Sequence, residues 1–147
     1  MSIDVQELKD RFVGHQFDEK DFEIQSEDLV EFAASCGETH PRFVDPSHPD
    51  FQAVPNFTTR FHGHRQLPEG FPMETRRSFD AGKAVEMKGP IRPGDTITAR
   101  SQIHDIYEKS GRSGGMLFCV HRMEFYNQRE ELVSIVDWKL VQRESTL

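Results

Sequence analysis

The segment Thr96–Tyr107 reads TITARSQIHDIY and alternates along its length between two kinds of side chain. Successive side chains of a β-strand point to opposite faces, so every second residue is expected on the same face. The expected inner face carries Ile97, Ala99, Ser101 and Ile103. A strand with one apolar and one polar face is typical of an antiparallel sheet that covers a core on one side. This segment therefore predicts the sheet around which the rest of the chain is arranged.

Strand-like patterns recur on both sides of this segment. They lie at residues 15–25, 75–79, 83–88, 116–126 and 132–141. Residues 80–82 (Asp-Ala-Gly) are expected to form a tight turn between two strands, and residues 109–115, with three glycines, a mobile loop. The last strand has apolar residues on both faces, which predicts a cover on both. One cover would be a helix, and the other a loop or a second subunit.

The clearest helix is predicted between the flanking residues Ser26 and Gly37. Ser26 is its expected N-cap, two acidic residues follow in the first turn, and Gly37 stands just past its end. The spacing of its apolar residues predicts one buried stripe. That stripe consists of Leu29, Phe32, Ala33 and Cys36.

Two further helices are expected at residues 4–12 and 56–67, the latter capped by Asn56 and ended by Pro68. Between them, residues 40–55 contain four prolines and are expected to form an ordered loop. Helical segments followed by a row of antiparallel strands predict an α+β fold. We expect a single domain over 1–147, with an open sheet whose edge strand is covered by another chain.

The composition excludes several classes of protein. Lys and Arg number 18 and Asp and Glu 25, so the net charge of −7 excludes a mainly electrostatic nucleic-acid binder. No apolar stretch approaches the roughly 20 residues of a membrane span, and the first residues lack the regions of a secretion signal. We therefore expect a soluble, cytoplasmic protein. The two cysteines have no metal or disulfide spacing, and His62 and His64 would point apart on a helix, so no metal site is predicted.

Two other stretches resemble a known family. Residues 36–45 read CGETHPRFVD and are similar to the motif Ser-Gly-Asp-x-Asn-Pro-x-His-x-Asp of catalytic MaoC-like hydratases and dehydratases. Residues 87–97 read MKGPIRPGDTI and, with residues 105–115 and 125–133, resemble the non-catalytic N-terminal half of double-hotdog dehydratases. The resemblance covers residues 14–143. It implies the hotdog fold, a curved antiparallel sheet wrapped around a central helix.

In catalytic members of the family, the Asp and the His of this motif hold the water that adds to an enoyl thioester and move its protons. A backbone N–H at the start of the central helix faces the thioester oxygen. The motif is degenerate in this chain: Glu38 stands at the Asp position, His40 at the Asn position, and Phe43, which cannot exchange a proton, at the His position. The matching positions are Gly37, Pro41 and Asp45.

The resemblance therefore implies a non-catalytic subunit that shapes the acyl and coenzyme A pocket for a catalytic hotdog partner. The implied substrate is an enoyl-coenzyme A of fatty acid or steroid metabolism, with no further cofactor. Phosphate contacts are expected among the basic residues of strand ends and turns, of which Arg92 and Arg112 are the best candidates. The others are Arg76, Arg77, Arg100 and Lys109. Phe57 and Phe61 are the candidate acyl contacts.

Two other functions stay open. The chain could act alone as a hydratase or thioesterase in which Glu38 activates water with help from His40. Glu38 is more simply explained as a residue that is solvated or that holds its loop by hydrogen bonds. Thioesterases of this fold commonly carry an acid on the central helix, and residues 56–68 contain none. The chain could also be a homodimer that binds acyl thioesters without chemistry.

One departure from the family concerns the backbone. Relatives place a glycine before Glu-Leu-Val in the last hairpin, where this chain has Glu130. If the position requires a positive φ, a residue with a side chain costs roughly 1 kcal/mol there.

Overall fold

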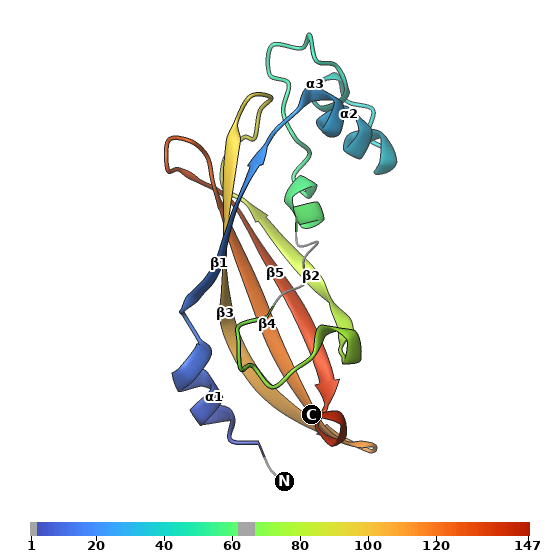
Figure 1. The fold of residues 1–147 in the computed structure, drawn as a ribbon. Helices are drawn as coiled ribbons and strands as arrows, with labels where there is room; N and C mark the ends of the chain where they lie inside the picture. The colour runs from blue at the N-terminus through green and yellow to red at the C-terminus, as the bar shows by residue number, and fades with distance from the viewer. Residues whose placement is uncertain (1–2, 62–66) are drawn as a thin grey trace.

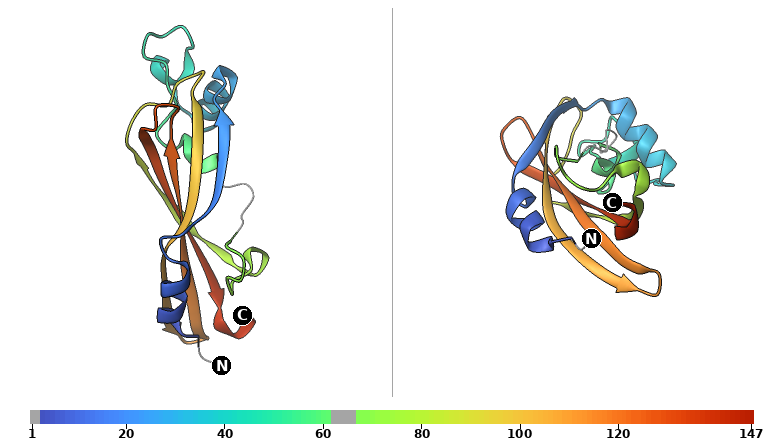
Figure 2. Two further views of the ribbon diagram at one scale, coloured as in Figure 1. Left: turned by 60° about the vertical axis from the view of Figure 1, so that its left-hand side comes forward. Right: turned by 60° about the horizontal axis from the view of Figure 1, so that its bottom comes forward.

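The computed structural model describes residues 3–61 and 67–147. Its centre is a five-stranded antiparallel sheet with the strand order β1-β3-β4-β5-β2 (Figure 1). Both views of Figure 2 show the long strands curving together. The strands are β1 (Gln16–Glu23), β2 (Phe79–Met87), β3 (Thr96–Gly111), β4 (Gly114–Tyr126) and β5 (Leu132–Arg143). The predicted α+β class and curved antiparallel sheet are confirmed.

The helices are short. They are α1 (Val5–Phe12), α2 (Ser26–Ser35) and α3 (Pro41–Val44), with the 3-10 helices η1 (Phe57–Phe61), η2 (Thr75–Arg77) and η3 (Glu144–Thr146). α2, α3 and η1 gather at one end of the sheet, and α1 and the C-terminus lie at the other (Figure 1). In the part of the chain that the structure describes, no helix has the length and apolar character needed to cross a bilayer.

The alternating pattern of residues 96–107 fixes which face of β3 is buried. The four side chains predicted for the inner face are at most 2% exposed. The same alternation continues in β4 and β5, whose inner faces include Phe125, Val136 and Trp138. β3, β4 and β5 thus form the centre of the sheet and supply most of the core.

The core consists of two clusters of apolar side chains. One lies under α2 and η1 and contains Leu29, Phe57, Ile97 and Phe125, with Phe32, Phe43 and Phe61 packed against it. The other lies toward α1 and contains Phe12, Ile103, Leu117 and Trp138. Fully burying one Phe or Leu side chain contributes about 1.5–3 kcal/mol, so these clusters hold the helices on the sheet.

Two details of the helix predicted after Ser26 are wrong. Gln25, not Ser26, occupies the N-cap position, and its side chain makes no capping hydrogen bond. The negative charges of Glu27 and Asp28 in the first turn take over the favourable interaction with the helix N-terminus. Cys36 is exposed, because the helix ends at Ser35 and the buried stripe stops one turn earlier, at Ala33.

The segment between residues 40 and 67 also differs from expectation. Its proline-rich first part contains the four-residue helix α3, which begins at Pro41. Residues 57–61 form a 3-10 helix where a longer α-helix over 56–67 was predicted, and residues 62–66 lie outside the described residues. Thr58 and Thr59 are poor α-helix formers, and the hydroxyl of Thr59 bonds the carbonyl of Asn56 at 2.7 Å, which favours the tighter turn.

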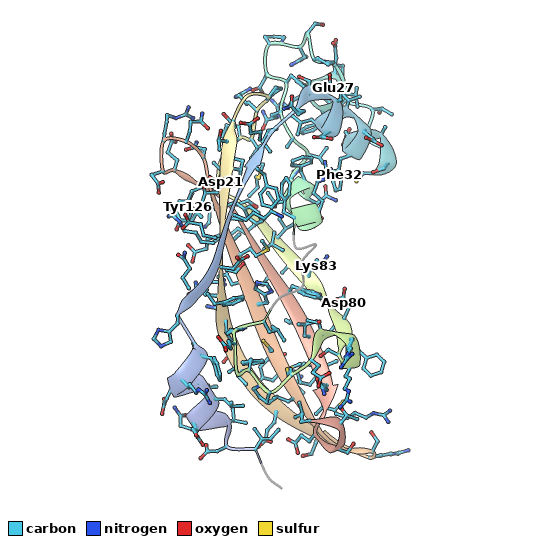
Figure 3. The ribbon with its side chains drawn as sticks, in the orientation of Figure 1. Asp21, Glu27, Phe32, Asp80, Lys83 and Tyr126 are labelled. Atoms are coloured by element: carbon cyan, nitrogen blue, oxygen red, sulfur yellow. The ribbon has the colours of Figure 1, made fainter. Side chains whose placement is uncertain are left out.

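Two predicted turns are continuous with strands. β2 runs through residues 80–82, which form an irregularity in its pairing with β5 rather than a hairpin turn, and residues 75–77 are a 3-10 helix. Asp80 and Lys83 mark the two sides of this bulge (Figure 3). Residues 109–115 are not a mobile loop, because β3 extends to Gly111 and pairs directly with β4 from Gly114.

Glu130 has a φ of 57°, the only positive φ of a non-glycine residue among those that the structure describes. The turn between β4 and β5 therefore needs the left-handed conformation that the sequence comparison suggested. The Glu130 carboxylate compensates in part, because it accepts hydrogen bonds from the Arg100 guanidinium at 3.1 and 3.3 Å.

Candidate functional site

The degenerate motif begins at the C-terminal end of α2. Gly37 has a φ of 74°, and its N–H donates to the carbonyl of Ala34 at 3.0 Å. The N–H of Glu38 donates to the carbonyl of Ala33 at 3.0 Å. This pair of bonds is a Schellman motif, which requires a left-handed residue where Gly37 stands. The motif glycine thus turns the chain and places Glu38 just beyond the helix.

The carboxylate of Glu38 is held by its own loop. Its Oε1 accepts hydrogen bonds from the N–H groups of Thr39 and His40 at 3.0 and 2.9 Å. These bonds, led by that from His40, lower the pKa of Glu38 below its ordinary value. A carboxylate stabilised in its ionised form is a weaker base, so this position is poorly suited to taking a proton from water.

The next residues build α3 and bring a benzene ring to the His position of the family. His40 is the N-cap of α3: its Nδ1 accepts a hydrogen bond from the N–H of Arg42 at 3.1 Å. Pro41 opens the helix, where its missing N–H costs nothing. Phe43 is half-buried against the first core cluster, 6.0 Å from the His40 ring between centroids.

Asp45 is the C-cap of α3, and its carboxylate also accepts hydrogen bonds from its own loop. Its Oδ1 accepts hydrogen bonds from the hydroxyl and the N–H of Ser47 at 2.7 and 2.9 Å. The hydroxyl bond is the main reason why the pKa of Asp45 is lowered. The polar side chains of the motif therefore hold successive turns of their own loop by hydrogen bonds.

Arg92, predicted to bind a phosphate, makes an ion-pair network beside the motif. Asp50 receives the Arg92 Nη2 at 2.8 Å and the Arg42 Nε at 2.9 Å. Arg92 Nη1 also donates to the carbonyl of Phe51 at 3.3 Å. The Arg92 hydrogen bond is the main cause of the lowered pKa of Asp50. The network ties the motif loop to the turn before β3, which gives Arg92 a structural role in this chain.

η1 lies next to the end of α2. The Asn56 amide donates to the Sγ of Cys36 at 3.7 Å, and the N–H groups of Phe57 and Thr59 donate to backbone carbonyls within the turn. Phe57 is fully buried, and its ring contacts Phe61 and Phe32 at 5.4 Å between centroids. The two candidate acyl contacts thus belong to an aromatic cluster over the sheet, directly beside the degenerate motif.

The structure brings some predicted site residues together and separates others. Glu38, His40, Phe43 and Asp45 lie at one end of the sheet with Arg92. Arg112 is exposed in the β3–β4 hairpin, at the opposite end (Figure 1). Sequence reasoning missed Asp50, because one of the two arginines that it binds, Arg92, lies 42 residues away along the chain.

Across residues 3–61 and 67–147, no three His, Cys, Asp or Glu side chains are grouped so that they could hold an ion. His62 and His64 lie outside the described residues.

The curved antiparallel sheet, with α2 and η1 gathered at one end of it, has the architecture of the hotdog fold. The family model of the FAS1-like dehydratase domain region matches residues 11–136. The chain belongs to this MaoC-like hotdog family.

Individual proteins agree with this assignment. A UPF0336 protein of Streptomyces griseus is 27% identical to the chain and covers 92% of it and 95% of its own length. The MaoC-like dehydratase of Rhodospirillum rubrum has a TM-score of 0.67 at 22% identity, covering 92% of this chain and 95% of its own. A chain of the HadBC (3R-hydroxyacyl-ACP dehydratase) complex of Mycobacterium tuberculosis also has a TM-score of 0.67 at 22% identity, with 86% and 92% covered. At these identities the two structures show a shared fold.

Proposed function

We propose that this chain is a non-catalytic subunit of an enoyl-coenzyme A hydratase or dehydratase, and that it completes the acyl pocket of a catalytic hotdog partner. The substrate is the coenzyme A thioester, and no other cofactor takes part. The observation that carries the proposal is Phe43, a half-buried benzene ring at the position where the family's motif has a proton-transferring His. A hydrocarbon ring can help to line a pocket but cannot move a proton.

The chemistry makes this substitution decisive. Hydration adds the oxygen of water to one carbon of the double bond and a proton to the other, so one group must take a proton and one must give it. Glu38 is held ionised by two backbone N–H groups, and His40 Nδ1 is engaged as a helix cap. The motif of this chain therefore offers no acid and base around one water.

The edge strand β2 supports association with a second hotdog chain. Every residue from Phe79 to Glu86 is exposed. Val85 lies opposite Val136 of β5 and so on the core side of the sheet, yet it is exposed. An uncovered edge strand presents free backbone groups for pairing with another strand. A partner strand alongside residues 84–87 of β2 would add backbone hydrogen bonds at this edge and cover Val85.

The HadBC structure is a complex of dehydratase chains, and this relationship supports an assembly of two hotdog chains here as well. The half-buried Phe61, which packs on the fully buried Phe57, supports the acyl-binding part of the proposal, because apolar surface is what an acyl chain needs. Phe43 thus bears on the missing chemistry, β2 on the association with a partner, and the aromatic cluster on acyl binding.

The test compares the chain alone with the chain co-expressed with a MaoC-like protein that has the intact Asp and His, such as the product of an adjacent open reading frame. Hydration of crotonyl-coenzyme A is followed by the loss of enoyl absorbance. We expect the chain alone to be inactive and the complex active. Replacing the partner's Asp by Asn should abolish activity. Glu38→Gln in this chain, which keeps an oxygen to accept the loop hydrogen bonds, should leave the activity of the complex unchanged.

Rapid hydration by the purified chain alone, abolished by Glu38→Gln, would overturn the proposal and select a stand-alone enzyme. Native mass spectrometry separates the remaining alternative. A homodimer that binds the thioester and gains no activity with any motif-bearing partner would contradict a role in catalysis.

A further inference from the structure

A pocket of about 710 Å³ lies where the start of β2 meets the C-terminal turn, away from the degenerate motif. Its lining residues are Arg76, Arg77, Phe79, Arg143, Ser145 and Thr146. Three arginines therefore line one pocket in a protein whose net charge is −7. Such clustering is opposite to the charge of the whole chain, and it favours an anionic ligand.

Only part of this positive charge is compensated nearby. Glu74 Oε2 receives the Nε atoms of both Arg76 and Arg77, at 3.1 and 3.5 Å. Arg77 Nη1 donates to the carbonyl of Thr146 at 3.2 Å. The neighbouring Glu108 carboxyl group on β3 raises the pKa of Glu144, mainly because the protonated acid can hydrogen-bond to it. Two exposed guanidinium groups thus share one carboxylate.

The two walls of the pocket are joined by a buried side chain. Gln142 has no exposed surface. Its Oε1 accepts hydrogen bonds from the N–H of Glu74 at 2.9 Å and the hydroxyl of Ser78 at 3.3 Å. Its Nε2 donates to the carbonyl and the hydroxyl of Thr146, each at 3.1 Å. Gln142 therefore holds η2, which carries Arg76 and Arg77, against η3, so the two turns that carry the arginines are fixed relative to each other.

Phe79 adds an apolar surface to this charged pocket. Its side chain is 64% exposed, the most exposed of the large apolar residues that the structure describes. The bulge between Asp80 and Lys83 separates it from the regular part of β2, over residues 83–87, that is available for pairing with a partner. Guanidinium groups match phosphate oxygens, and an exposed aromatic face stacks on a nucleobase. The combination fits a nucleotide better than a simple anion.

The position of the pocket also fits the partner's reaction. β2 begins beside the pocket and ends at Met87. The chain then leads to Ile91, and the carbonyl of Ile91 accepts a hydrogen bond from the N–H of Ala53 in the motif loop at 2.8 Å. The far end of β2 therefore lies near the motif. An antiparallel partner strand along β2 runs the opposite way. The motif-bearing end of a hotdog partner would therefore lie next to this pocket.

We propose that Arg76, Arg77, Arg143 and Phe79 form a binding site for the phosphorylated nucleotide of coenzyme A, through which this chain holds the thioester whose acyl group reaches the partner's catalytic residues. The placement next to the partner rests on the proposed function, whereas the binding site itself lies within one chain. Gln142 is the positioning residue of this site. Phosphopantetheine on a carrier protein shares the phosphate chemistry but lacks the base.

The test is a calorimetric titration of the full chain with coenzyme A, 3′-dephospho-coenzyme A and pantetheine 4′-phosphate. We expect the affinities to fall in that order. Arg76→Ala with Arg77→Ala, and Arg143→Ala separately, should each weaken coenzyme A binding about tenfold or more, because each removes charge-assisted hydrogen bonds. Phe79→Ala should weaken coenzyme A by about fivefold or more and leave pantetheine 4′-phosphate unchanged. Arg129→Ala, which removes an exposed arginine from the β4–β5 turn, is the matched control and should bind as the wild type does.

Gln142→Ala should lower the affinity while the intact arginines remain, and thermal melting verifies that each variant is folded. Unchanged coenzyme A binding in a folded variant that lacks all three arginines would overturn the site, as would the absence of binding to the wild type at millimolar ligand. Equal affinity for coenzyme A and pantetheine 4′-phosphate, with no effect of Phe79→Ala, would overturn the nucleotide assignment in favour of a carrier protein.

The outcomes for this site and for the proposed function are distinguishable, because the titration needs no partner. An active complex whose coenzyme A affinity ignores the arginines refutes the site and leaves the subunit role intact. Arginine-dependent binding by a chain that never supports hydration refutes the subunit role and leaves the site intact.

Discussion

The hydrogen bond between Thr58 and Ser134 allows a quantitative test of how η1 is attached to the sheet. The two hydroxyl oxygens are 2.8 Å apart, and the residues are 1% and 0% exposed. Thr58→Val removes one hydroxyl while keeping the shape of the side chain, and Ser134→Ala removes the other. Each single variant leaves the remaining hydroxyl buried without its partner.

The expected magnitude follows from this burial. A buried polar group that loses its partner costs about 1–3 kcal/mol, whereas removing both partners is nearly neutral. Each single variant should therefore lower the free energy of unfolding by about 1–3 kcal/mol. For a chain of this size, each kcal/mol corresponds to about 2–4 °C in Tm. The double variant should be less destabilised than the sum of the single variants, with a coupling energy of at least about 1 kcal/mol.

Urea unfolding followed by circular dichroism, with thermal melts in parallel, gives the four free energies of this cycle. Thr59→Val is the matched control. Its hydroxyl bonds the carbonyl of Asn56 at 2.7 Å, and that carbonyl belongs to an exposed residue and can turn to water. The control should change stability by less than about 0.5 kcal/mol. Additive single effects, or single effects no larger than that of the control, would refute the position of η1 against β5.

Three further predictions concern cysteine reactivity, pH dependence and the last turn. The native protein should take up one thiol label, at the exposed Cys36, and a second label only after unfolding, because burial raises the pKa of Cys119 to about 12. Mass spectrometry counts the labels, and two labels on the native protein would contradict the prediction. The Arg92 hydrogen bond lowers the pKa of Asp50 in the folded state, so the ionised Asp50 contributes stability above its unfolded pKa of 3.8, and this contribution is lost as the pH falls through the folded pKa. Tm should therefore drop over this acidic range, and Asp50→Asn should make the drop smaller. An unchanged dependence of Tm on pH in the variant would contradict the prediction. The Glu130→Gly variant should be about 1 kcal/mol more stable than Glu130→Ala, because both lose the Arg100 ion pair and only glycine adopts a φ of 57° without strain. Equal free energies of unfolding in urea would show that the turn is not strained.

The parts of the fold that depend on local patterns could be predicted from the sequence. The alternation of residues 96–107 specifies the buried face of β3, and the spacing from Leu29 to Ala33 specifies the buried face of α2. The Glu38, His40 and Phe43 positions could be compared with the family motif because the motif is a contiguous stretch. Ser26 and Cys36 were misassigned, because the exact end of a helix depends on where its last turn leaves the core.

The sequence by itself determined the antiparallel sheet, the degenerate motif and the acidic character of the chain, since periodicity, residue identity and charge are properties of neighbouring residues. Only the tertiary structure decided that Asp50 engages Arg92, that β2 is uncovered on its core side, and that Arg143 joins Arg76 and Arg77 in one pocket. These juxtapositions arise when strands far apart in the chain pair in a particular register. A register is chosen by the packing of the whole sheet, and no local pattern records it.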